Sequence, residues 1–190
     1  MRVIAGKYKG RKLDTLKNLK VRPTSDRVKE SVFSIIRKKV TDANFLDLCA
    51  GSGNIGIEAL SQGAKQVTFL DEDLQSIRLI KQNLEKCGLN SHNPQILMLR
   101  SDASKGINIL SKQRKVYELI YFDPPYNAGI YKHCITQISD ERILETKGLL
   151  LIEHHHNTQL PLDIGTLRCD RQNRYGETRI SFYRHKGFKK

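Results

Sequence analysis

The stretch FLDLCAGSGNIGIEAL, residues 45–60, decides the fold class of this 190-residue chain. It opens on an apolar run at 45–49 that is typical of a buried strand, and it ends in the start of a helix. Between them stands Gly51-Ser52-Gly53-Asn54-Ile55-Gly56, a G-x-G-x-x-G loop. Such loops are typical of nucleotide-binding α/β sheets, although a bare motif also occurs as a simple tight turn.

Strand and helix patterns alternate along the rest of the chain. Further strands are expected at 66–70, 95–99, 116–122 and 148–153, and a final pair at 167–171 and 178–183 has only a short connection. The clearest helix runs from Leu74 to Cys87, where apolar residues recur at helical spacing before Gly88. The alternation predicts an α/β fold with a doubly wound, mostly parallel sheet of seven strands and an antiparallel C-terminal edge. Ligands of such sheets bind beyond the carboxyl ends of the strands.

A basic N-terminal segment precedes the alternating pattern. Residues 1–15 alternate and carry Gly6 and Gly10, which predicts a short β-hairpin. The stretch VRPTSDRVKESVFSIIRKKV, at 21–40, predicts a helix, because capping residues follow Pro23 and an apolar stripe recurs at helical spacing. We therefore expect two parts, a basic extension at 1–42 and a sheet domain at 43–190.

Charge is segregated along the chain. Residues 1–40 hold 13 Lys and Arg against 3 Asp and Glu, residues 168–190 hold 8 against 2, and the middle is slightly acidic. Basic ends on an acidic body are typical of a catalytic domain that grips a polyanion, although a merely solvated surface is the alternative. No apolar run approaches the roughly 18 residues of a membrane span, and no signal peptide is evident, so a cytoplasmic location is expected. The four scattered cysteines indicate reduced thiols.

Three aspartates near successive strand ends decide between two cofactors. Asp71 lies 20 residues after Gly51, where it could accept from ribose hydroxyls, and this alone would also fit a dinucleotide. Asp47 would repel a pyrophosphate at the loop but suits the sulfonium and ammonium of S-adenosylmethionine. Asp102 could accept from the adenine amino group, unless these acids only cap helices. We therefore predict S-adenosylmethionine, held by Asp47, Ala50, Gly51, Ser52, Gly53, Asp71 and Asp102.

The stretch YFDPPYN, at 121–127, ends the fourth expected strand and supplies the reactive chemistry. An exocyclic amine of a nucleobase becomes nucleophilic when both N–H bonds are held and its nitrogen can pyramidalise. The Asp123 carboxylate can accept one hydrogen and the Pro124 carbonyl the other, for an in-line displacement driven mainly by positioning. Pro125 keeps the backbone stiff and Tyr126 stacks on the base. These four residues are the predicted catalytic set, although x-Pro-Pro is also an ordinary strand terminator.

At these motifs the sequence resembles a known family. D-P-P-Y after the fourth strand is similar to the signature of enzymes that methylate adenine N6, cytosine N4 and guanine N2. Together with RVIAGKYKGRKL, VRPTSDRVKESVFSII and DLCAGSGNIGIEALSQGA, it resembles the RsmD family of bacterial 16S rRNA guanine-N2 methyltransferases, from Arg2 to about Gly148. The resemblance implies a class I, Rossmann-like methyltransferase fold and methylation of one guanine N2 in 16S rRNA, within an assembling or assembled 30S subunit. The stretch EHHH at 153–156 is a departure that touches no catalytic motif.

The resemblance and the charge pattern also indicate RNA contacts. The segment Arg22, Pro23, Thr24, Asp26, Arg27 matches the family's N-terminal signature, so Thr24 is expected near the cofactor and the arginines near phosphate, with surface salt bridging as the alternative. The predicted RNA-binding set is Arg2, Lys7, Lys9, Arg11, Lys12, Arg22, Arg27 and Arg174. No metal site is expected, because His154, His155 and His156 on one strand would point to alternate faces.

We therefore interpret the chain as a monomeric rRNA methyltransferase, with three alternatives left open. A DNA adenine-N6 methyltransferase could use the same DPPY chemistry, and identifying the modified nucleoside would separate it. A nicotinamide-dependent oxidoreductase could use the glycine loop, and titration with NADH would reveal it. A non-catalytic RNA-binding module would show no methyl transfer, either as the wild type or as the Asp123→Ala variant.

Overall fold

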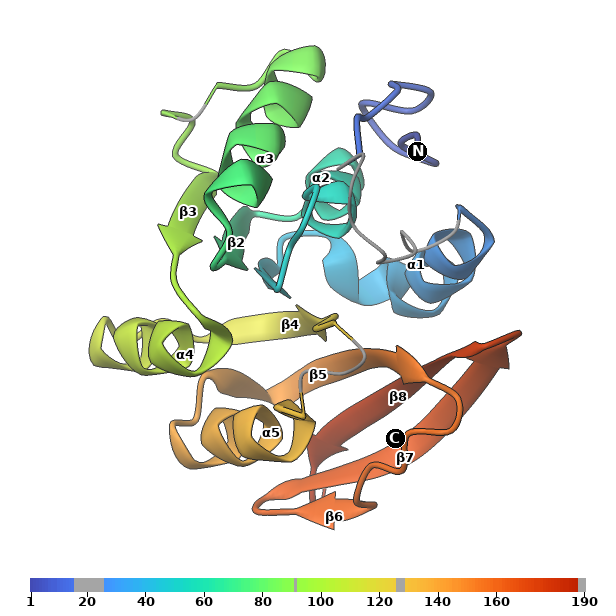
Figure 1. The fold of residues 1–190 in the computed structure, drawn as a ribbon, viewed down its shortest axis with the longest axis vertical. Helices are drawn as coiled ribbons and strands as arrows, with labels where there is room; N and C mark the ends of the chain where they lie inside the picture. Colours follow the sequence, from blue (N-terminus) through green and yellow to red (C-terminus); the bar gives the residue numbers. More distant parts are fainter. Residues whose placement is uncertain (16–25, 91, 126–128, 188–190) are drawn as a thin grey trace.

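The residues that the computed structural model describes, 1–15, 26–90, 92–125 and 129–187, form one sheet of eight strands with helices on both of its faces (Figure 1). In chain order the elements are α1 (Asp26–Val40), β1 (Asn44–Leu48), α2 (Asn54–Ser61), β2 (Gln66–Asp71), α3 (Leu74–Lys86), β3 (Ile96–Arg100), α4 (Ala103–Lys112), β4 (Tyr117–Phe122), α5 (Tyr131–Asp140), β5 (Leu144–His155), β6 (Asp163–Ile164), β7 (Leu167–Tyr175) and β8 (Thr178–His185).

The sheet has the strand order β3-β2-β1-β4-β5-β8-β7-β6. Strands β1 to β5 pair in parallel, and β8 then pairs with both β5 and β7 in the antiparallel direction. This confirms the predicted α/β class with a mostly parallel sheet and an antiparallel C-terminal edge. The additional strand, β6, has two residues and pairs with β7.

Two apolar layers hold the helices to the sheet. Along each central strand, successive side chains enter opposite layers, as Phe45 and Leu46 do in β1. Helices α1, α2 and α3 contribute to the layer that contains Phe45, whereas α4 and α5 contribute to the layer that contains Leu46. Strands β1 and β4 are therefore buried on both faces, which is typical of a parallel sheet and places their carboxyl ends at one edge.

The N-terminal residues dock on α2 (Figure 1). The predicted hairpin at 1–15 is present as a single antiparallel bridge between Arg2 and Lys12, flanked by a hydrogen bond from the Val3 amide to the Arg11 carbonyl. Gly6 approaches the backbone of α2 so closely that a Cβ atom would lie 1.8 Å from the Ser61 carbonyl oxygen. Contacts with α2, rather than a long series of hydrogen bonds between two strands, therefore hold this N-terminal segment in place.

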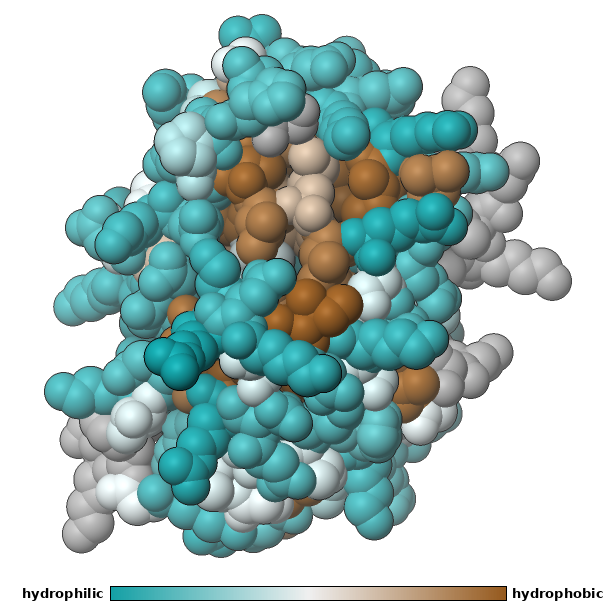
Figure 2. Space-filling view, turned by 90° about the vertical axis from the view of Figure 1, so that its left-hand side faces the viewer, coloured by the Kyte–Doolittle hydropathy of each residue, from teal (hydrophilic) through white to brown (hydrophobic). Residues whose placement is uncertain are grey.

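Figure 2 shows the side of the molecule that carries the edge strand β3, where a mostly hydrophilic surface surrounds an apolar area. Three residues of β3, Leu97, Met98 and Leu99, are only partly buried. None of the helices in the described part of the chain has both the length and the apolar character needed to cross a membrane.

Candidate active site

A cavity of about 550 Å³ opens where the parallel strands end. Residues from the ends of β1, β2 and β4, from the segment between β3 and α4, from the first turns of α2 and α5, and from the N-terminal segment all line it. The lining comprises Met1, Thr15, Asp47, Cys49, Ala50, Gly51, Ser52, Asn54, Ile55, Leu70, Asp71, Glu72, Asp73, Ser76, Ser101, Asp102, Ala103, Ser104, Asp123, Pro125, Ile130, His133 and Cys134. This is the position at which ligands bind to open parallel sheets.

The glycine loop after β1 is a tight turn with a specific need for glycine. Gly51 has a φ of +53° and Gly53 a φ of +73°, both in the left-handed region that favours glycine. Gly56 serves packing instead, because a Cβ atom on it would lie 2.3 Å from the Phe69 ring. The loop therefore lets α2 begin close against β2, with its first turn facing the cavity.

Asp47 lies beneath this loop with only 2% of its surface exposed. Its carboxylate accepts a hydrogen bond from the Gly56 amide at 2.8 Å and also lines the cavity. Burial raises the pKa of Asp47 to about 8, so near neutral pH the carboxyl group is largely protonated until a cation approaches it. The sequence predicted an ionised side chain near the mouth of the loop, whereas the structure places a deeply buried carboxyl there.

Asp71 and Asp102 line the cavity and also bond to the backbone. Asp71 accepts from the amides of Gly51 at 2.7 Å and Asp73 at 2.9 Å, and burial raises its pKa. Asp102 caps α4 by accepting from the Lys105 amide at 3.0 Å, and this bond lowers its pKa. Capping and ligand binding are compatible for Asp102, whose side chain is 37% exposed at the cavity edge.

The lining is strongly acidic. It contains six carboxyl groups (Asp47, Asp71, Glu72, Asp73, Asp102, Asp123) and, among the described residues, no Lys or Arg. A pyrophosphate in this cavity would meet several like charges and no Lys or Arg side chain among the described lining residues, whereas a cationic ligand would meet attraction. The lining therefore disfavours a dinucleotide and favours a ligand that carries positive charge.

The DPPY motif reaches the cavity from the end of β4. Among its described residues, Asp123 and Pro125 line the cavity, whereas Pro124 is buried between them and lies outside the lining. The Asp123 amide donates to the Leu48 carbonyl at 3.2 Å, which fixes the motif against β1. Tyr126 and Thr24 lie outside the described residues, and Gly53 shapes the loop without entering the lining.

A buried network behind the cavity was missed from the sequence. The fully buried Lys29 ammonium donates to the Arg2 carbonyl and to Asn54 Oδ1, each at 2.6 Å, and lies 3.1 Å from Glu58 Oε2. Glu58 in turn accepts from the Ile4 and Ala5 amides. Lys29 therefore ties α1 to α2 and to the N-terminal segment. The sequence pattern that indicates such a network is a lysine among the apolar positions of a predicted helix.

The same network fixes the orientation of Asn54. Because an ammonium only donates, the atom that Lys29 contacts must be the amide oxygen, and Asn54 Nδ2 is the remaining donor. This nitrogen is buried and, within the described part of the chain, has no hydrogen-bond partner. Asn54 is a lining residue of the cavity at the start of α2, so an unpaired buried donor lies next to the site, beside a helix N-terminus.

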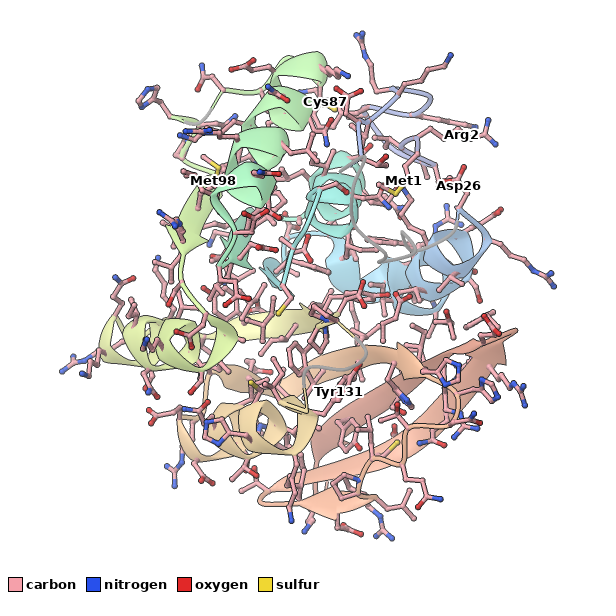
Figure 3. The ribbon with its side chains drawn as sticks, in the orientation of Figure 1. Met1, Arg2, Asp26, Cys87, Met98 and Tyr131 are labelled. Atoms are coloured by element: carbon pink, nitrogen blue, oxygen red, sulfur yellow. The ribbon has the colours of Figure 1, made fainter. Side chains whose placement is uncertain are left out.

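The predicted RNA-binding residues lie on two parts of the surface. Residues Lys7, Lys9, Arg11 and Lys12 are exposed on the N-terminal segment, and Arg27 is exposed on α1. Arg2 pairs with Asp26 at 3.4 Å, at the start of α1 (Figure 3), and Arg174 is exposed near the end of β7, next to Tyr175, which hydrogen-bonds to Ser31 of α1. Arg22 lies outside the described residues.

In the EHHH stretch the rings of His155 and His156 lie together, with centroids 4.5 Å apart, whereas the His154 ring packs against Tyr131. His154 is buried, and its ring nitrogens lie 3.0 Å from the His155 carbonyl oxygen and 2.8 Å from Ser181 Oγ. Burial lowers the pKa of His154. Across the described residues, no group of three or more His, Cys, Asp or Glu side chains is arranged to hold a metal ion.

Strand order, the glycine turn under α2 and an acidic cavity at the carboxyl edge together define the class I methyltransferase fold. The solved structure titled "Putative methyltransferase yhhF from Escherichia coli" has this fold, with a TM-score of 0.80 at 26% identity over 97% of both chains. Within that class, residues 1–184 match the family model described as "Conserved hypothetical protein 95". The chain belongs to this family, which is the RsmD family that its motifs resemble.

Two curated relatives agree with this assignment. The Bacillus subtilis (strain 168) protein named "Putative rRNA methyltransferase YlbH" is 37% identical over 187 residues, which cover 98% of this chain and all of the relative. The Haemophilus influenzae protein "Ribosomal RNA small subunit methyltransferase D" is 31% identical over 153 residues, which cover 80% of this chain and 78% of the relative.

Proposed function

We propose that this protein transfers a methyl group from S-adenosylmethionine to the exocyclic N2 amine of a guanine in 16S rRNA. Its relatives, named as rRNA methyltransferases, support methyl transfer to rRNA. The single observation that carries the proposal is the acidic cavity with Asp123 of the DPPY motif in its lining. A cavity rich in carboxylates accepts a cationic methyl donor, and the same Asp123 can accept a hydrogen from the target amine.

The residues around the glycine loop fit this cofactor. When bound, S-adenosylmethionine supplies a methyl group on a positively charged sulfur. Asp47 would face its cationic part, Asp71 its ribose hydroxyls and Asp102 its adenine amine. Asn54 Nδ2 supplies a donor for the carboxylate of the methionine moiety, and the first amides of α2 add a favourable dipole there. This arrangement assigns an acceptor to Asn54 Nδ2, a buried donor that has no hydrogen-bond partner among the described residues.

Asp123 holds the target amine. Its carboxylate accepts one N–H of the exocyclic amine and stabilises the positive charge that develops on nitrogen as the methyl group arrives. The methylated nitrogen is cationic and acidic, so it then loses a proton to Asp123 or to water. The Pro124 carbonyl is the proposed second acceptor, Pro125 stiffens the turn, and Tyr126 is proposed to stack on the base.

Methylation assays with labelled S-adenosylmethionine test this function. We expect transfer to 16S rRNA or to 30S subunits, with N2-methylguanosine as the product after hydrolysis to nucleosides. N6-methyladenosine in duplex DNA would instead identify the alternative enzyme, and tight binding of NADH would identify an oxidoreductase. Absence of transfer to every substrate, with S-adenosylmethionine still bound, would contradict the proposal.

The Asp123 carboxylate has a sharper test. The Asp123→Asn and Asp123→Ala substitutions are expected to lower kcat about 10²–10³-fold, because they remove a group that acts in the transition state. Calorimetric affinity for S-adenosylmethionine is expected to change by less than a few fold. Asp140→Ala, which removes an exposed carboxylate at the end of α5, serves as the matched control and is expected to keep full activity.

A further inference from the structure

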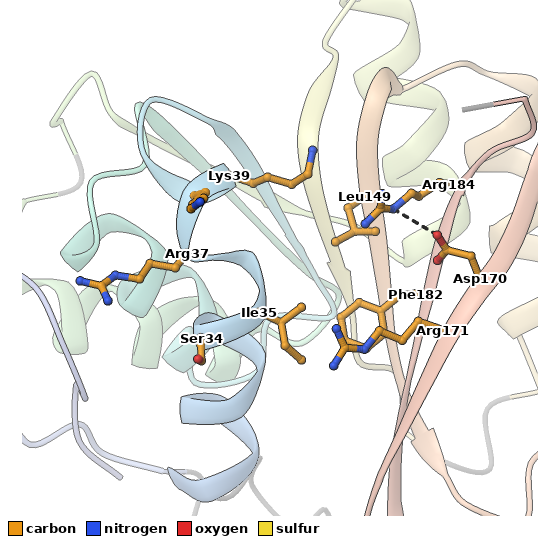
Figure 4. Close-up of a pocket in the computed structure, with 10 residues that line it drawn as sticks. Ser34, Ile35, Arg37, Lys39, Leu149, Asp170, Arg171, Phe182 and Arg184 are labelled. Atoms are coloured by element: carbon orange, nitrogen blue, oxygen red, sulfur yellow. Dashed lines mark ion pairs between the residues drawn. The ribbon is translucent and has the colours of Figure 1, made fainter. Parts of the chain in front are cut away.

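A second hollow lies outside the catalytic cavity. It has a volume of about 390 Å³ and separates the C-terminal half of α1 from β5, β7 and β8 (Figure 4). We call it the α1–β8 groove and define it by Ser34, Ile35, Lys38, Arg171, Phe182 and Arg184. It shares no lining residue with the catalytic cavity in the described part of the chain, so the mechanism above leaves it unexplained.

The floor of the groove is apolar and supports a flat cation. Ile35 points from α1 toward Phe182 of β8, and both pack in the core layer of α1 (Figure 4). The guanidinium carbon of Arg171 lies 5.5 Å from the centroid of the Phe182 ring, and its Nε donates to Asn173 Oδ1 at 3.0 Å. Arg171 is therefore held in place although its side chain is exposed.

The sides of the groove are basic. Lys38 is exposed on α1, and Lys39 donates to the Lys147 carbonyl at 3.1 Å. Arg184 Nε lies 3.5 Å from Asp170 but forms no hydrogen bond with any described residue, so a buried donor is incompletely satisfied. Arg37 also belongs to the lining, but its guanidinium points away from the strands in Figure 4.

Helix stability does not account for this charge. Basic residues in the last turn of α1 are favourable for the helix dipole, which explains Lys38 and Lys39 without a ligand. Arg171 and Arg184 come from strands, however, where no such effect operates, and they face α1 across the same hollow. Cations from three elements thus converge on one groove, and Asp170 is the single acid among the described residues of its lining.

The groove and the catalytic edge lie toward opposite ends of α1, since Lys39 at the groove contacts Lys147 near the start of β5. A hydrogen bond between Ser31 and Tyr175, 2.5 Å long, joins α1 to the end of β7. At that end of the hairpin, Thr178 pairs with His155 of β5, where β5 ends at the same edge as β4. A chain that leaves the catalytic cavity would pass along α1 beyond Ser31 to reach the groove.

We propose that the α1–β8 groove binds the sugar–phosphate backbone of the rRNA substrate, outside the nucleotide that enters the cavity. The inference rests on the proposed function for the identity of the polyanion. Guanidinium groups with a fixed plane suit phosphate oxygens, and an apolar floor suits the ribose face of an RNA strand. A concave groove of this kind suits a strand better than a flat anionic membrane surface.

Equilibrium binding to 16S rRNA over a range of salt concentrations tests the groove without relying on catalysis. The variant Lys38→Gln/Arg171→Gln removes two charges and leaves shorter, neutral polar side chains. Lys112→Gln/Arg114→Gln removes the same pair of residue types from the end of α4, on the opposite face of the sheet, and is the matched control. The melting temperature and the affinity for S-adenosylmethionine verify that each variant is folded.

We expect the groove variant to bind rRNA about tenfold more weakly near 0.1 M salt, with an unchanged affinity for S-adenosylmethionine. Each lost phosphate contact lowers the magnitude of the slope of log K against log salt by about 0.7 for a single strand, so two contacts lower it by about 1.4.

Binding equal to that of the control variant would overturn the proposal. A loss seen with 30S subunits but not with free rRNA would also overturn it, because the groove would then contact a protein. Wild-type protein that binds rRNA but does not methylate it would contradict the proposed function and leave the groove result valid.

Discussion

Asp47 shows how burial can tune one carboxyl group for a cationic ligand. A carboxyl with a pKa of about 8 is mostly neutral at pH 6. Binding of an ammonium or sulfonium beside it is therefore coupled to loss of the carboxyl proton. We predict that the affinity for S-adenosylmethionine rises on the order of tenfold between pH 6 and pH 7.5, as the ionised fraction of Asp47 grows. Isothermal titration calorimetry in buffers of different ionisation enthalpy measures both the affinity and the released proton.

The Asp47→Asn variant is the control for that pH dependence. It keeps an acceptor for the Gly56 amide but cannot ionise, so its affinity is expected to be lower and nearly flat over the same range. A wild-type profile that is flat as well would exclude Asp47 as the titrating group. The pH dependence of folding stability has the opposite sign to that of cofactor binding. Since the pKa of Asp47 is raised in the native state, the contribution of Asp47 to stability is present at low pH and is lost as pH rises through about 8.

Asn54 allows a test in which the ligand is changed as well as the protein. Its unpaired Nδ2 is expected to serve the cofactor carboxylate, so Asn54→Ala should weaken S-adenosylmethionine about 10–100-fold, the value of a hydrogen bond to a charged group. The decarboxylated analogue of S-adenosylmethionine lacks that carboxylate and should bind both proteins within about threefold. Calorimetric titration of the four combinations gives the coupling between residue and carboxylate. Equal weakening of both ligands would mean that Asn54 acts through the fold.

At the scale of elements, the N-terminal segment, α1 and α2 meet in one buried ion pair. Lys29→Met should lower the free energy of unfolding by about 3–5 kcal/mol, because Glu58 is left buried without its cation. Adding Glu58→Gln should recover part of that loss, since the second substitution removes the uncompensated charge. Urea denaturation measures both effects, and Lys38→Met, on an exposed position of the same helix, should stay within about 0.5 kcal/mol of wild type. An equally small effect of Lys29→Met would contradict the assigned role.

The elements also show which structural features local sequence determines. Strand ends and the glycine turn follow from local patterns, so Asp47, Asp71, Asp102 and Asp123 were expected together before any coordinates, and the cavity brings all four into one lining. Lys29 and Asn54 could not be found this way. Their burial depends on how the N-terminal segment docks on α2, which is a contact between distant residues.

The predicted strand boundaries were wrong where the local sequence is polar or very short. Strand β5 was expected at 148–153 but begins at Leu144, because its first residues include exposed Thr146 and Lys147 and pair irregularly with β4. Strand β6 has two residues, too few for any alternation. In both places the neighbouring strand, rather than the sequence of the segment, sets the backbone conformation.

For the whole molecule, the separation of charge assigns different ligands to different regions. The cavity is acidic and suits a cation, whereas the excess of basic over acidic residues lies in the N-terminal segment, in α1 and in the C-terminal hairpin. A polyanion is thus attracted to the periphery and repelled from the cofactor pocket itself. This division predicts that binding of S-adenosylmethionine depends weakly on salt while binding of RNA depends steeply on it.

Neutralising the N-terminal cations tests that division. The triple variant Lys7→Gln/Lys9→Gln/Lys12→Gln removes three exposed charges from a segment that docks on α2 through its backbone. Its KM for rRNA should rise at least tenfold at 0.15 M salt with kcat within twofold of wild type, because phosphate contacts position the substrate without entering the transition state. Lys112→Gln/Arg114→Gln/Lys115→Gln is the control with the same change in net charge, and it should leave KM within twofold. If both triple variants raised KM alike, net charge alone would explain RNA attraction, and the N-terminal segment would have no specific role.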